Sequence, residues 1–405
     1  MNVLKQAKTK KRVVVAMSGG VDSSVAAALL VEQGYDVVGM MMRLWSEPGM
    51  GDAAPANRCC TPDQMADARR VAGILNIPFY VVDVQDHFRQ TVVQFFIDEH
   101  DNGRTPNPCI ECNRQIRFTY LLERALALDA SYLATGHYAQ VRHTASGYQL
   151  LKGRDENKDQ SYVLHVLNQE KLGQVLFPIG GYTKLEVRQL AQKFGLPVAS
   201  KSESQDLCFL GDGNYRRFLQ EYSQKASHPG PILNSHGQKL GQHNGLPFYT
   251  IGQRKGLGIS VGEPLFVLRK DVAKNTLIVG SKSELGQQTL IARDVNWLNG
   301  QPPTGSVVAQ IKIRYKAKGV QGVVIDLGNG RSQVTLHEPV FGITAGQGAI
   351  FYDGDVCLGG GIIADEPNSM EETACPRKGV GAVNTSVDTS PNTPSLQLAH
   401  IQVHS

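Results

Sequence analysis

Residues Arg12–Gly34 read RVVVAMSGGVDSSVAAALLVEQG, and this stretch decides the predicted fold of the first half of the chain. The β-branched run Arg12–Met17 predicts a buried strand, and the Ala- and Leu-rich segment Ser23–Gln33 predicts a helix that ends at Gly34. The connecting segment Ser18–Ser24, SGGVDSS, has glycines that allow close backbone approach, serine hydroxyls that can donate, and a helix N-terminus that favours anions. A plain strand–helix turn would explain a glycine pair, but the whole string in this context favours phosphate binding.

Strand and helix signals continue to alternate after this stretch. Strands are predicted at Asp36–Trp45, Phe79–Val84 and Tyr132–Tyr138, and helices from Pro62 onward and over His87–His100. Strands separated by helices indicate a doubly wound parallel sheet that binds its ligand at the carboxyl ends of the strands.

The composition of the sequence changes near Gly211, where glycine, proline and short alternating runs become frequent. We therefore expect an α/β catalytic domain over residues 1–212, a small mixed domain over 213–284 and a β-barrel or sandwich over 285–365. Residues 366–405 contain no aromatic residue and predict a disordered tail.

Composition excludes few functions. The formal net charge of +4 over 405 residues neither marks nor excludes a nucleic-acid-binding protein. The sequence has no apolar run long enough to span a membrane, and its basic, polar start does not resemble a signal peptide, so a soluble cytoplasmic protein is expected. Seven cysteines, an odd number, argue against a disulfide framework.

Two cysteines lie in polar surroundings that suit reactive thiols. Cys112 is expected in a loop fixed by two prolines, over Arg104–Arg114, that leads into a helix, and the neighbouring Arg114 and Arg117 favour the thiolate. Cys208 lies in another polar loop. Cys109 forms a Cys-x-x-Cys pair with Cys112, a spacing that suits redox chemistry or metal binding, but zinc needs about four ligands and a structural metal is not expected.

The other cysteines carry no chemical signal. Cys357 lies in an apolar strand and is expected to be buried and inert, as are Cys59 and Cys60, whereas Cys375 falls in the tail.

The segment 311–318, IKIRYKAK, alternates strictly between apolar and basic residues. As a strand it would place four cations on one face, which is typical either of a solvated barrel surface or of a surface that meets RNA phosphates. The residues alone leave both interpretations open.

Six motifs in collinear order together resemble the bacterial tRNA-specific 2-thiouridylases, members of the PP-loop ATP pyrophosphatase superfamily. They are SGGVDSS, NPCIECN, ATGHYA, SQDLCFL, YTIGQRKGLG and FYDGDVCLGGGII, and the resemblance covers about residues 10–364. It implies an adenine nucleotide alpha-hydrolase-like first domain and a C-terminal barrel that binds tRNA. The implied activity is ATP-dependent 2-thiolation of the wobble uridine of tRNA, through an adenylated uridine and a cysteine persulfide.

The resemblance also implies roles for individual residues. The nucleophile falls on Cys112 and the persulfide carrier on Cys208, and turnover leaves a disulfide between them. The implied ATP-binding residues are Ala16, Met17, Ser18, Gly19, Gly20, Val21, Asp22, Ser23, Met42 and Gly136. The implied tRNA-binding residues are Asn107, Pro108, Cys109, His137, Lys158, Asp159, Gln160, Arg314, Tyr315 and Gln347.

Further expectations concern cofactors and partners. The nucleotide loop lacks a Walker lysine, the resemblance places the chemistry at the α-phosphate, and Asp22 would help to hold Mg²⁺. The partners implied are tRNA and an upstream sulfur donor, either a cysteine desulfurase or a sulfur-relay protein. Cys109 departs from the pattern, because some family members carry a candidate acid/base aspartate there.

Two other functions remain open for a sequence with these features. One is a PP-loop ligase that forms amides on a small molecule, which would not need Cys208 or a tRNA-binding extension. The other is a non-catalytic RNA-binding protein, which would not need the intact SGGVDSS loop and both cysteines.

Overall fold

The computed structural model describes residues 10–47, 61–202, 207–210, 212–259 and 262–365. The predicted tail over 366–405 lies outside the described residues, as do Cys59, Cys60 and Cys375.

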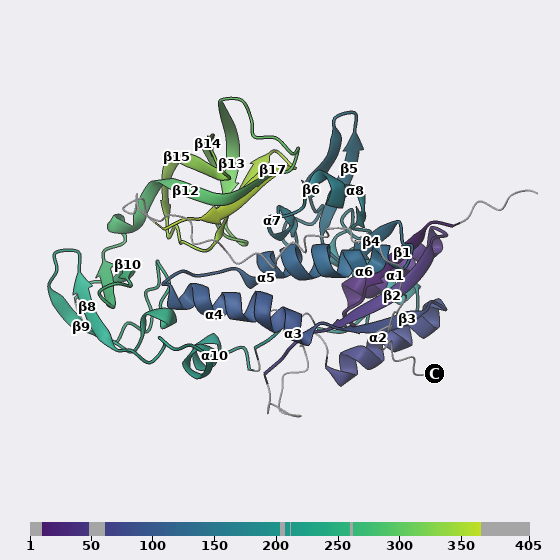
Figure 1. Ribbon diagram of the computed structural model, residues 1–405, viewed down its shortest axis with the longest axis horizontal. Coiled ribbons are helices and arrows are strands. Elements are labelled where there is room, and N and C mark those ends of the chain that lie inside the picture. Colours follow the sequence, from purple (N-terminus) through teal and green to yellow (C-terminus); the bar gives the residue numbers. More distant parts are fainter. Residues whose placement is uncertain (1–9, 48–60, 203–206, 211, 260–261, 366–405) are drawn as a thin grey trace, which may run out of the picture. The chain divides into compact units, whose positions relative to one another are not determined.

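A parallel five-stranded sheet organises the first half of the chain (Figure 1). Its strand order is β3-β2-β1-β4-β7, and every neighbouring pair is parallel. The strands are β1 (Arg12–Ala16), β2 (Asp36–Arg43), β3 (Phe79–Asp83), β4 (Tyr132–Thr135) and β7 (Val175–Leu176).

Helices cover both faces of this sheet, so its central strand is buried on both sides. Val13 and Val15 of β1 pack in one core cluster and Val14 packs in another, as the twofold alternation of a strand requires. The first cluster contains α1 (Val21–Glu32), α2 (Pro62–Leu75) and α9 (Lys184–Lys193). The second contains α3 (Gln85–Phe88), η2 (Arg89–Val93), α4 (Gln94–Asp101), α5 (Pro108–Glu111), η3 (Cys112–Leu121) and α6 (Leu122–Leu126). The predicted doubly wound parallel sheet is confirmed.

A four-stranded sheet with its own small core follows in the chain. Its order is β10-β11-β8-β9, with β8 and β11 parallel and the other pairs antiparallel. The core contains Ile232, Val267, Leu277 and Val279. The elements are α10 (Tyr215–Tyr222), β8 (Gly230–Asn234), β9 (Lys239–His243), η4 (Leu246–Phe248), β10 (Phe266–Asp271), β11 (Thr276–Gly280) and η5 (Ser283–Leu285).

The last strands close into a six-stranded antiparallel barrel, which confirms the barrel alternative over the sandwich. The order β12-β15-β14-β13-β16-β17 is closed by pairing of β12 with β17. Gly361 of β17 permits this closure, because a Cβ there would lie 2.5 Å from the carbonyl oxygen of Arg293. The strands are β12 (Gly286–Trp297), β13 (Ser306–Lys312), β14 (Val320–Gly328), β15 (Arg331–Phe341), β16 (Gly348–Asp353) and β17 (Val356–Ile363).

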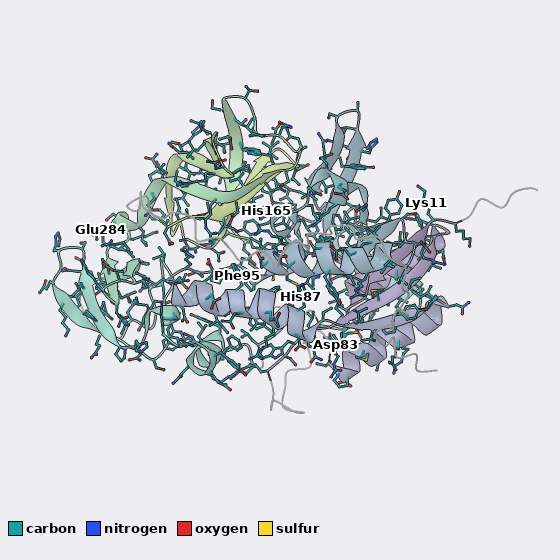
Figure 2. The ribbon with its side chains drawn as sticks, viewed as in Figure 1. Lys11, Asp83, His87, Phe95, His165 and Glu284 are labelled. Atoms are coloured by element: carbon teal, nitrogen blue, oxygen red, sulfur yellow. The ribbon has the colours of Figure 1, made fainter. Side chains whose placement is uncertain are left out.

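A hairpin from the first half of the chain extends the barrel sheet. It consists of β5 (Ala139–Thr144) and β6 (Gly147–Lys152), and β6 pairs with β17. The short helices α7 (Ser161–Leu164) and α8 (Gln169–Gly173) follow it. His165, labelled in Figure 2, lies just after α7, and its carbonyl oxygen accepts a hydrogen bond of 2.6 Å from Asn296 of β12. The α/β half and the barrel are thus tied together by backbone pairing and by side chains.

Within the described residues, no helix is long and apolar enough to cross a membrane.

Candidate functional site

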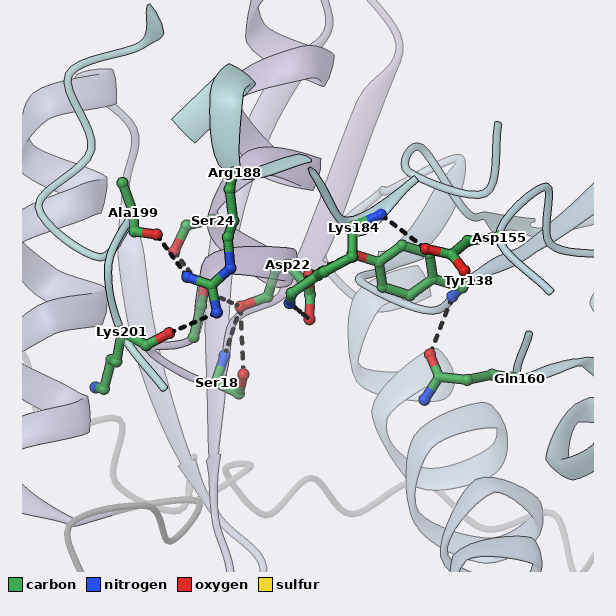
Figure 3. A network of polar contacts seen from close by, with 12 residues as sticks. Ser18, Asp22, Ser24, Tyr138, Asp155, Gln160, Lys184, Arg188, Ala199 and Lys201 are labelled. Carbon is green, nitrogen blue, oxygen red and sulfur yellow. Dashed lines mark hydrogen bonds and ion pairs between the residues drawn. The ribbon is translucent and has the colours of Figure 1, made fainter. Parts of the chain in front are cut away.

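The SGGVDSS segment forms the tight turn after β1 together with the start of α1, and its own serines hold it (Figure 3). The backbone N–H of Ser18 donates to the hydroxyl of Ser23 at 3.1 Å, and the hydroxyl of Ser24 donates to the carbonyl of Gly20 at 2.8 Å. Gly19 has a φ of +72°, and a Cβ there would lie 2.2 Å from the carbonyl oxygen of Gln64. Only glycine fits at this position, because α2 begins against the loop.

The loop opens onto a pocket at the carboxyl ends of the parallel strands. Of the ten residues expected to bind ATP, seven line it, whereas Gly19 and Gly20 in the turn and Val21 at the start of α1 do not line the pocket. The lining residues are Ala16, Met17, Ser18, Asp22, Ser23, Met40, Met41, Met42, Leu44, Arg117, Thr135, Gly136, His137 and Gln160.

Two residues expected to contact tRNA, His137 and Gln160, line this same pocket. The ring Nδ1 of His137 lies 2.7 Å from the hydroxyl of Thr135. Burial, and secondly the charge of Arg117, lowers the pKa of His137 well below its usual value. A neutral imidazole therefore stands at the wall of the pocket.

Gly136 has a packing reason to be glycine. A Cβ there would lie 2.7 Å from the backbone N of Ser23 and 2.8 Å from the carbonyl carbon of Asp22. The turn after β4 therefore rests directly on the start of α1, and this contact joins two walls of the pocket.

Asp22, in the first turn of α1, is held by two groups that sequence reasoning did not identify. The ammonium of Lys184 lies 2.8 and 2.9 Å from its two carboxylate oxygens, and the hydroxyl of Tyr138 donates to one of them at 2.7 Å (Figure 3). Lys184 comes from α9, 162 positions further along the chain. No local pattern marked it, since it merely follows the capping residue Thr183.

A second lysine reaches the loop from the segment that precedes Cys208. The Lys201 ammonium donates to the Gly19 carbonyl at 3.1 Å and pairs with Asp67 at 2.7 Å. Arg188 of α9 donates to the carbonyls of Ala199 and Lys201 at 2.7 and 3.0 Å. The described start of the Cys208 segment is thereby attached to the nucleotide loop and to α9, and Figure 3 shows the bonds of Arg188 to Ala199 and Lys201.

Cys112 was expected in a loop, and this expectation was wrong. Asn107 accepts a hydrogen bond from the backbone N–H of Cys109 at 3.1 Å and so caps α5, whose first residue is Pro108. The helix therefore begins before both cysteines. Cys109 is exposed, whereas Cys112 is 6% exposed and packs in the core.

The same helical run connects Cys112 with the nucleotide pocket. Asn113, fully buried, donates to the carbonyl of Val163 at 3.2 Å and accepts from Arg117 at 3.0 Å. Arg117 in turn lines the pocket. One helical element, η3, thus carries both a candidate nucleophile and a cation of the nucleotide site.

Cys208 lies in a turn, as expected, and is partly buried. The next two residues, Phe209 and Leu210, are buried in the core cluster that contains Cys112, and Cys208 itself packs against that cluster. The four cysteines in the described part of the chain, at 109, 112, 208 and 357, are reduced thiols. Both candidate thiols therefore lie against one core, without a disulfide between them.

An arginine fixes the chain just after the Cys208 turn. Arg217 of α10 contacts both carboxylate oxygens of buried Glu47, at 2.9 and 2.6 Å, and donates to Asp212 at 2.8 Å. These contacts raise the pKa of Arg217 and lower the pKa of Asp212 to about 2. Arg217 therefore holds Asp212 near Glu47, which follows β2 in the chain.

Three expected tRNA contacts belong to a folded turn. Asp159 is buried and accepts from the backbone N–H groups of Gly153 and Ser161 at 3.1 and 3.0 Å. The side chain of Gln160 accepts from the backbone N–H of Tyr138 at 3.0 Å. Lys158 precedes them and is half-buried. Asp159 and Gln160 face the protein, so their first role is to shape this turn.

The segment 311–318 is not the continuous strand that its alternation predicts. β13 ends at Lys312, and bends and turns follow up to residue 317. The Lys312 ammonium lies 3.8 Å from Asp159, whereas Lys316 and Lys318 are exposed. Arg314 donates to the carbonyl of Gly342 at 2.5 Å and to further loop acceptors. The four cations therefore have different environments, because Lys312 and Arg314 bind acceptors that are distant in the sequence.

The remaining expected contacts, Tyr315 and Gln347, also have partners. The Tyr315 ring lies 6.1 Å from the ring of Tyr162, and Gln347 donates to the carbonyl of Thr105 at 2.7 Å. Gln347 thus ties the barrel to the loop that precedes Asn107.

Two further expectations concern cysteine chemistry and metals. Cys357 is buried, which confirms the expected burial, and burial raises its thiol pKa. Among the described residues, no group of three or more His, Cys, Asp or Glu could hold a metal ion.

Comparisons with known proteins now bear on this site. Family models match in succession: the tRNA methyl transferase HUP domain at residues 11–212, the tRNA methyl transferase PRC-barrel domain at 216–281 and the aminomethyltransferase beta-barrel domain at 287–363. The U34-tRNA thiolase NcsA from Methanococcus maripaludis aligns over 53% of this chain and 65% of its own, at 19% identity and a TM-score of 0.33, which is too weak to support a conclusion.

Relatives of known activity are much closer in sequence. The tRNA-specific 2-thiouridylase of Moorella thermoacetica is 47% identical over 86% of this chain and 98% of its own length. That of Magnetococcus marinus is 49% identical over 87% of this chain and 99% of its own length. The chain belongs to the family of tRNA-specific 2-thiouridylases.

Proposed function

We propose that this chain is an ATP-dependent sulfurtransferase that converts the wobble uridine of tRNA to 2-thiouridine. The observation that carries the proposal is that η3 bears Cys112 at its start and Arg117 in the wall of the nucleotide pocket. A thiol and a nucleotide site on one helical element suit a reaction in which a base is first activated by ATP and then receives sulfur.

The first step activates the base. O2 of uridine attacks the α-phosphorus of ATP, the bond between the α- and β-phosphates breaks, and pyrophosphate leaves. The hydroxyls of Ser18 and Ser23 and the first turn of α1 bind the phosphates, and the apolar wall at Met42 contacts the adenosine. Neutral His137 donates or accepts one hydrogen bond in the pocket, and it adds no charge there.

Mg²⁺ suits this pocket, because magnesium in phosphate sites commonly uses one or two carboxylates together with substrate phosphates. Asp22 would hold it, and the ion would neutralise charge on the pyrophosphate when bound.

The second step transfers sulfur. A persulfide on Cys208 attacks C2 of the activated uridine, and AMP leaves with the former O2. The Cys112 thiolate then attacks Sγ of Cys208, the persulfide S–S bond breaks, and 2-thiouridine remains together with a Cys112–Cys208 disulfide. In an alternative order Cys112 attacks the persulfide first and releases sulfide, which attacks C2. A dithiol reductant and a cysteine desulfurase or sulfur-relay protein restore the persulfide.

We assign the remaining roles as the resemblance of the sequence motifs to the family implies them. The ATP site comprises residues 16–23, Met42 and Gly136, and the turn 107–109 meets the target base. The tRNA runs past Lys158–Gln160, His137, Arg314–Tyr315 and Gln347. Residues 1–212 form the catalytic domain, 213–284 the central domain and 285–365 the tRNA-binding barrel.

Nucleoside analysis of tRNA tests the proposal. The protein is incubated with tRNA, ATP and a cysteine desulfurase supplied with cysteine, and Cys112→Ser, Cys208→Ser and Cys109→Ser are compared. The first two variants should lose thiolation by about a hundredfold or more while retaining tRNA-stimulated ATP–pyrophosphate exchange, and Cys109→Ser should keep a substantial part of the activity.

Two results would contradict the proposal. One is wild-type exchange that does not respond to tRNA, which would favour a ligase acting on a small molecule. The other is an active Cys208→Ser variant with Cys109–Cys112 as the dominant disulfide after one turnover, found by peptide mass spectrometry.

A further inference from the structure

The thiol of Cys109 has no part in the proposed sulfur transfer, which uses Cys112 and Cys208. That transfer ends in a disulfide between these two residues, and the disulfide must be reduced before Cys208 can carry sulfur again. Cys112 is 6% exposed, Cys208 is partly buried, and both pack against one core cluster. Because exchange requires access to a sulfur atom, a reductant of protein size reaches such a disulfide poorly.

Cys109 is the exposed member of the Cys-x-x-Cys pair, and no other cysteine in the described part of the chain is as exposed. α5 ends at Glu111 and η3 begins at Cys112, whose φ of −59° and ψ of −43° are helical, so both cysteines belong to one helical run. Residues three apart on a helix lie on the same side of it. An exposed thiol therefore lies one helical turn from the buried Cys112.

The spacing permits a disulfide between Cys109 and Cys112. In a helix the Cα atoms of residues three apart lie about 5 Å from each other, inside the range of about 4.4–6.8 Å found for disulfides. The Cβ atoms, about 5–6 Å apart on a helix, have to approach by about 1–2 Å. That adjustment falls in the first turn, where backbone N–H groups have no intrahelical acceptor. The N–H of Cys109 bonds there to the side chain of Asn107 at 3.1 Å.

The segment that carries the pair is anchored at both ends. Before α5, Gln347 of the barrel region donates to the carbonyl of Thr105 at 2.7 Å. After the pair, the fully buried Asn113 donates to the carbonyl of Val163 at 3.2 Å. The formation of a bond within the pair is therefore confined to the residues between these two anchors.

We propose that Cys109 is a resolving thiol, which moves the disulfide from Cys112 and Cys208 to Cys109 and Cys112. This inference rests on the proposed function and extends it to the recovery of the enzyme after turnover. The thiolate of Cys109, having given its proton to solvent, attacks Sγ of Cys112. The bond between Cys112 and Cys208 breaks, and Cys208 leaves as a thiolate that can take up a proton. One disulfide replaces another, so no electrons are gained or lost in this step.

A protein dithiol then completes the reduction. One of its thiolates attacks Sγ of the exposed Cys109, and Cys112 leaves as a thiolate. The second thiol of the reductant attacks the mixed disulfide, so Cys109 leaves and the reductant ends as a disulfide, having supplied the two electrons. All three cysteines of the enzyme are then thiols, and Cys208 can be loaded again.

Reduction of the oxidised full chain tests this exchange, without tRNA or ATP. The wild type and Cys109→Ser are oxidised in a glutathione buffer, and peptide mass spectrometry identifies the bridges. The wild type should contain a bridge between Cys109 and Cys112, whereas Cys109→Ser should retain the bridge between Cys112 and Cys208. Reduction by thioredoxin, followed as NADPH consumption with thioredoxin reductase, should be about tenfold or more slower for Cys109→Ser, because the exposed sulfur is missing. Dithiothreitol, small enough to reach Cys208, should reduce the two proteins at rates within about threefold of each other.

Two further variants are matched controls. Cys109→Asp, which introduces the residue that some family members carry, lacks the thiol and should be reduced by thioredoxin as slowly as Cys109→Ser. Cys357→Ala removes the thiol of Cys357, which is 2% exposed in β17, and should be reduced at the wild-type rate. The controls separate the loss of the exposed thiol from the loss of a cysteine elsewhere in the chain.

Three results would overturn the inference. The first is an oxidised wild type without a bridge between Cys109 and Cys112, and the second is reduction of Cys109→Ser by thioredoxin at the wild-type rate. The third is an equal slowing of Cys109→Ser with thioredoxin and with dithiothreitol, which would show that the substitution acts on the structure of α5 alone.

The same assay separates this inference from the proposed function, because it contains no tRNA. A protein that thiolates tRNA but shows no exchange overturns the inference and leaves the function standing. Exchange in a protein that thiolates no tRNA supports the assignment of Cys109 and contradicts the proposed function.

Discussion

The SGGVDSS loop and the segment 311–318 both carry clear sequence patterns, yet only the first adopts the structure that its pattern predicts. The loop joins a strand to a helix and opens onto a pocket. The alternating basic segment leaves its strand at Lys312, and Arg314 turns inward to loop carbonyls.

The difference lies in where each pattern finds its partners. In the loop, the serine hydroxyls bond to groups within five positions, so the sequence contains both donors and acceptors. In the basic segment, the acceptors for Lys312 and Arg314 come from residues near 159 and 342. The structure of a segment can be predicted when its hydrogen-bond partners are local. The position of a charged side chain cannot, when its acceptors are distant in the sequence.

The largest effect is expected at the loop. Asp22→Ala should reduce AMP transfer to tRNA by about a hundredfold or more, because the variant loses a carboxylate at the phosphates, and should leave tRNA binding unchanged. Pyrophosphate release and filter binding of tRNA measure the two properties. Tyr138→Phe, which removes one hydrogen bond to Asp22 and keeps the Lys184 ion pair, is the control and should retain most activity. Thiolation by Asp22→Ala at nearly the wild-type rate would end the nucleotide-loop assignment.

The next effect concerns Arg314, which the structure makes a structural residue. Arg314→Ala leaves the carbonyl of Gly342 and the hydroxyl of Thr344 without this donor, and should lower the free energy of unfolding by about 1–3 kcal/mol. Chemical denaturation measures it. Lys316→Ala, an exposed neighbour, should change stability by less than about 0.5 kcal/mol. Equal stability of the two variants would show that the hydrogen bonds of Arg314 do not stabilise the fold.

A third effect uses pH to probe the pocket. The folded-state pKa of His137 lies well below its unfolded value of about 6.5, so acid protonates the unfolded state first. The stability contributed by neutral His137 is therefore present above pH 6.5 and is lost as the pH falls towards the folded-state pKa.

His137→Asn keeps a polar group near Thr135 and should flatten this fall by up to about 1.4 kcal/mol per pH unit, measured by denaturation between pH 4 and 6.5. An unchanged slope would mean that His137 titrates in the folded protein at its ordinary pKa.

The smallest effect concerns the two exposed lysines of the basic segment. Lys316→Ala with Lys318→Ala should weaken tRNA binding modestly and reduce the slope of log K against log salt by about 0.7–0.9 for each phosphate that a lysine no longer neutralises. Fluorescence titration at several salt concentrations measures the slope. A slope equal to that of the wild type would show that these lysines belong to an ordinary solvated surface and do not contact RNA phosphates.

Features that depend on local order along the chain could be predicted from the residues alone. Buried β-branched runs and Ala-rich segments produced the parallel sheet, and Gly19, whose positive φ and close contact exclude a side chain, belonged to a recognisable loop. The two candidate cysteines could also be singled out by their polar neighbours, although the sequence predicts a loop at Asn107 and Pro108, where the helix α5 in fact begins.

Tertiary structure alone decided which distant groups meet. Lys184 reaches Asp22 across 162 positions, and Arg217 reaches Glu47 across 170. Each contact depends on how helices and loops pack around the sheet, and a lysine or arginine has the same local appearance whether it faces solvent or a buried carboxylate. The physical reason is that burial and electrostatic pairing are properties of neighbours in space, which a linear pattern does not contain.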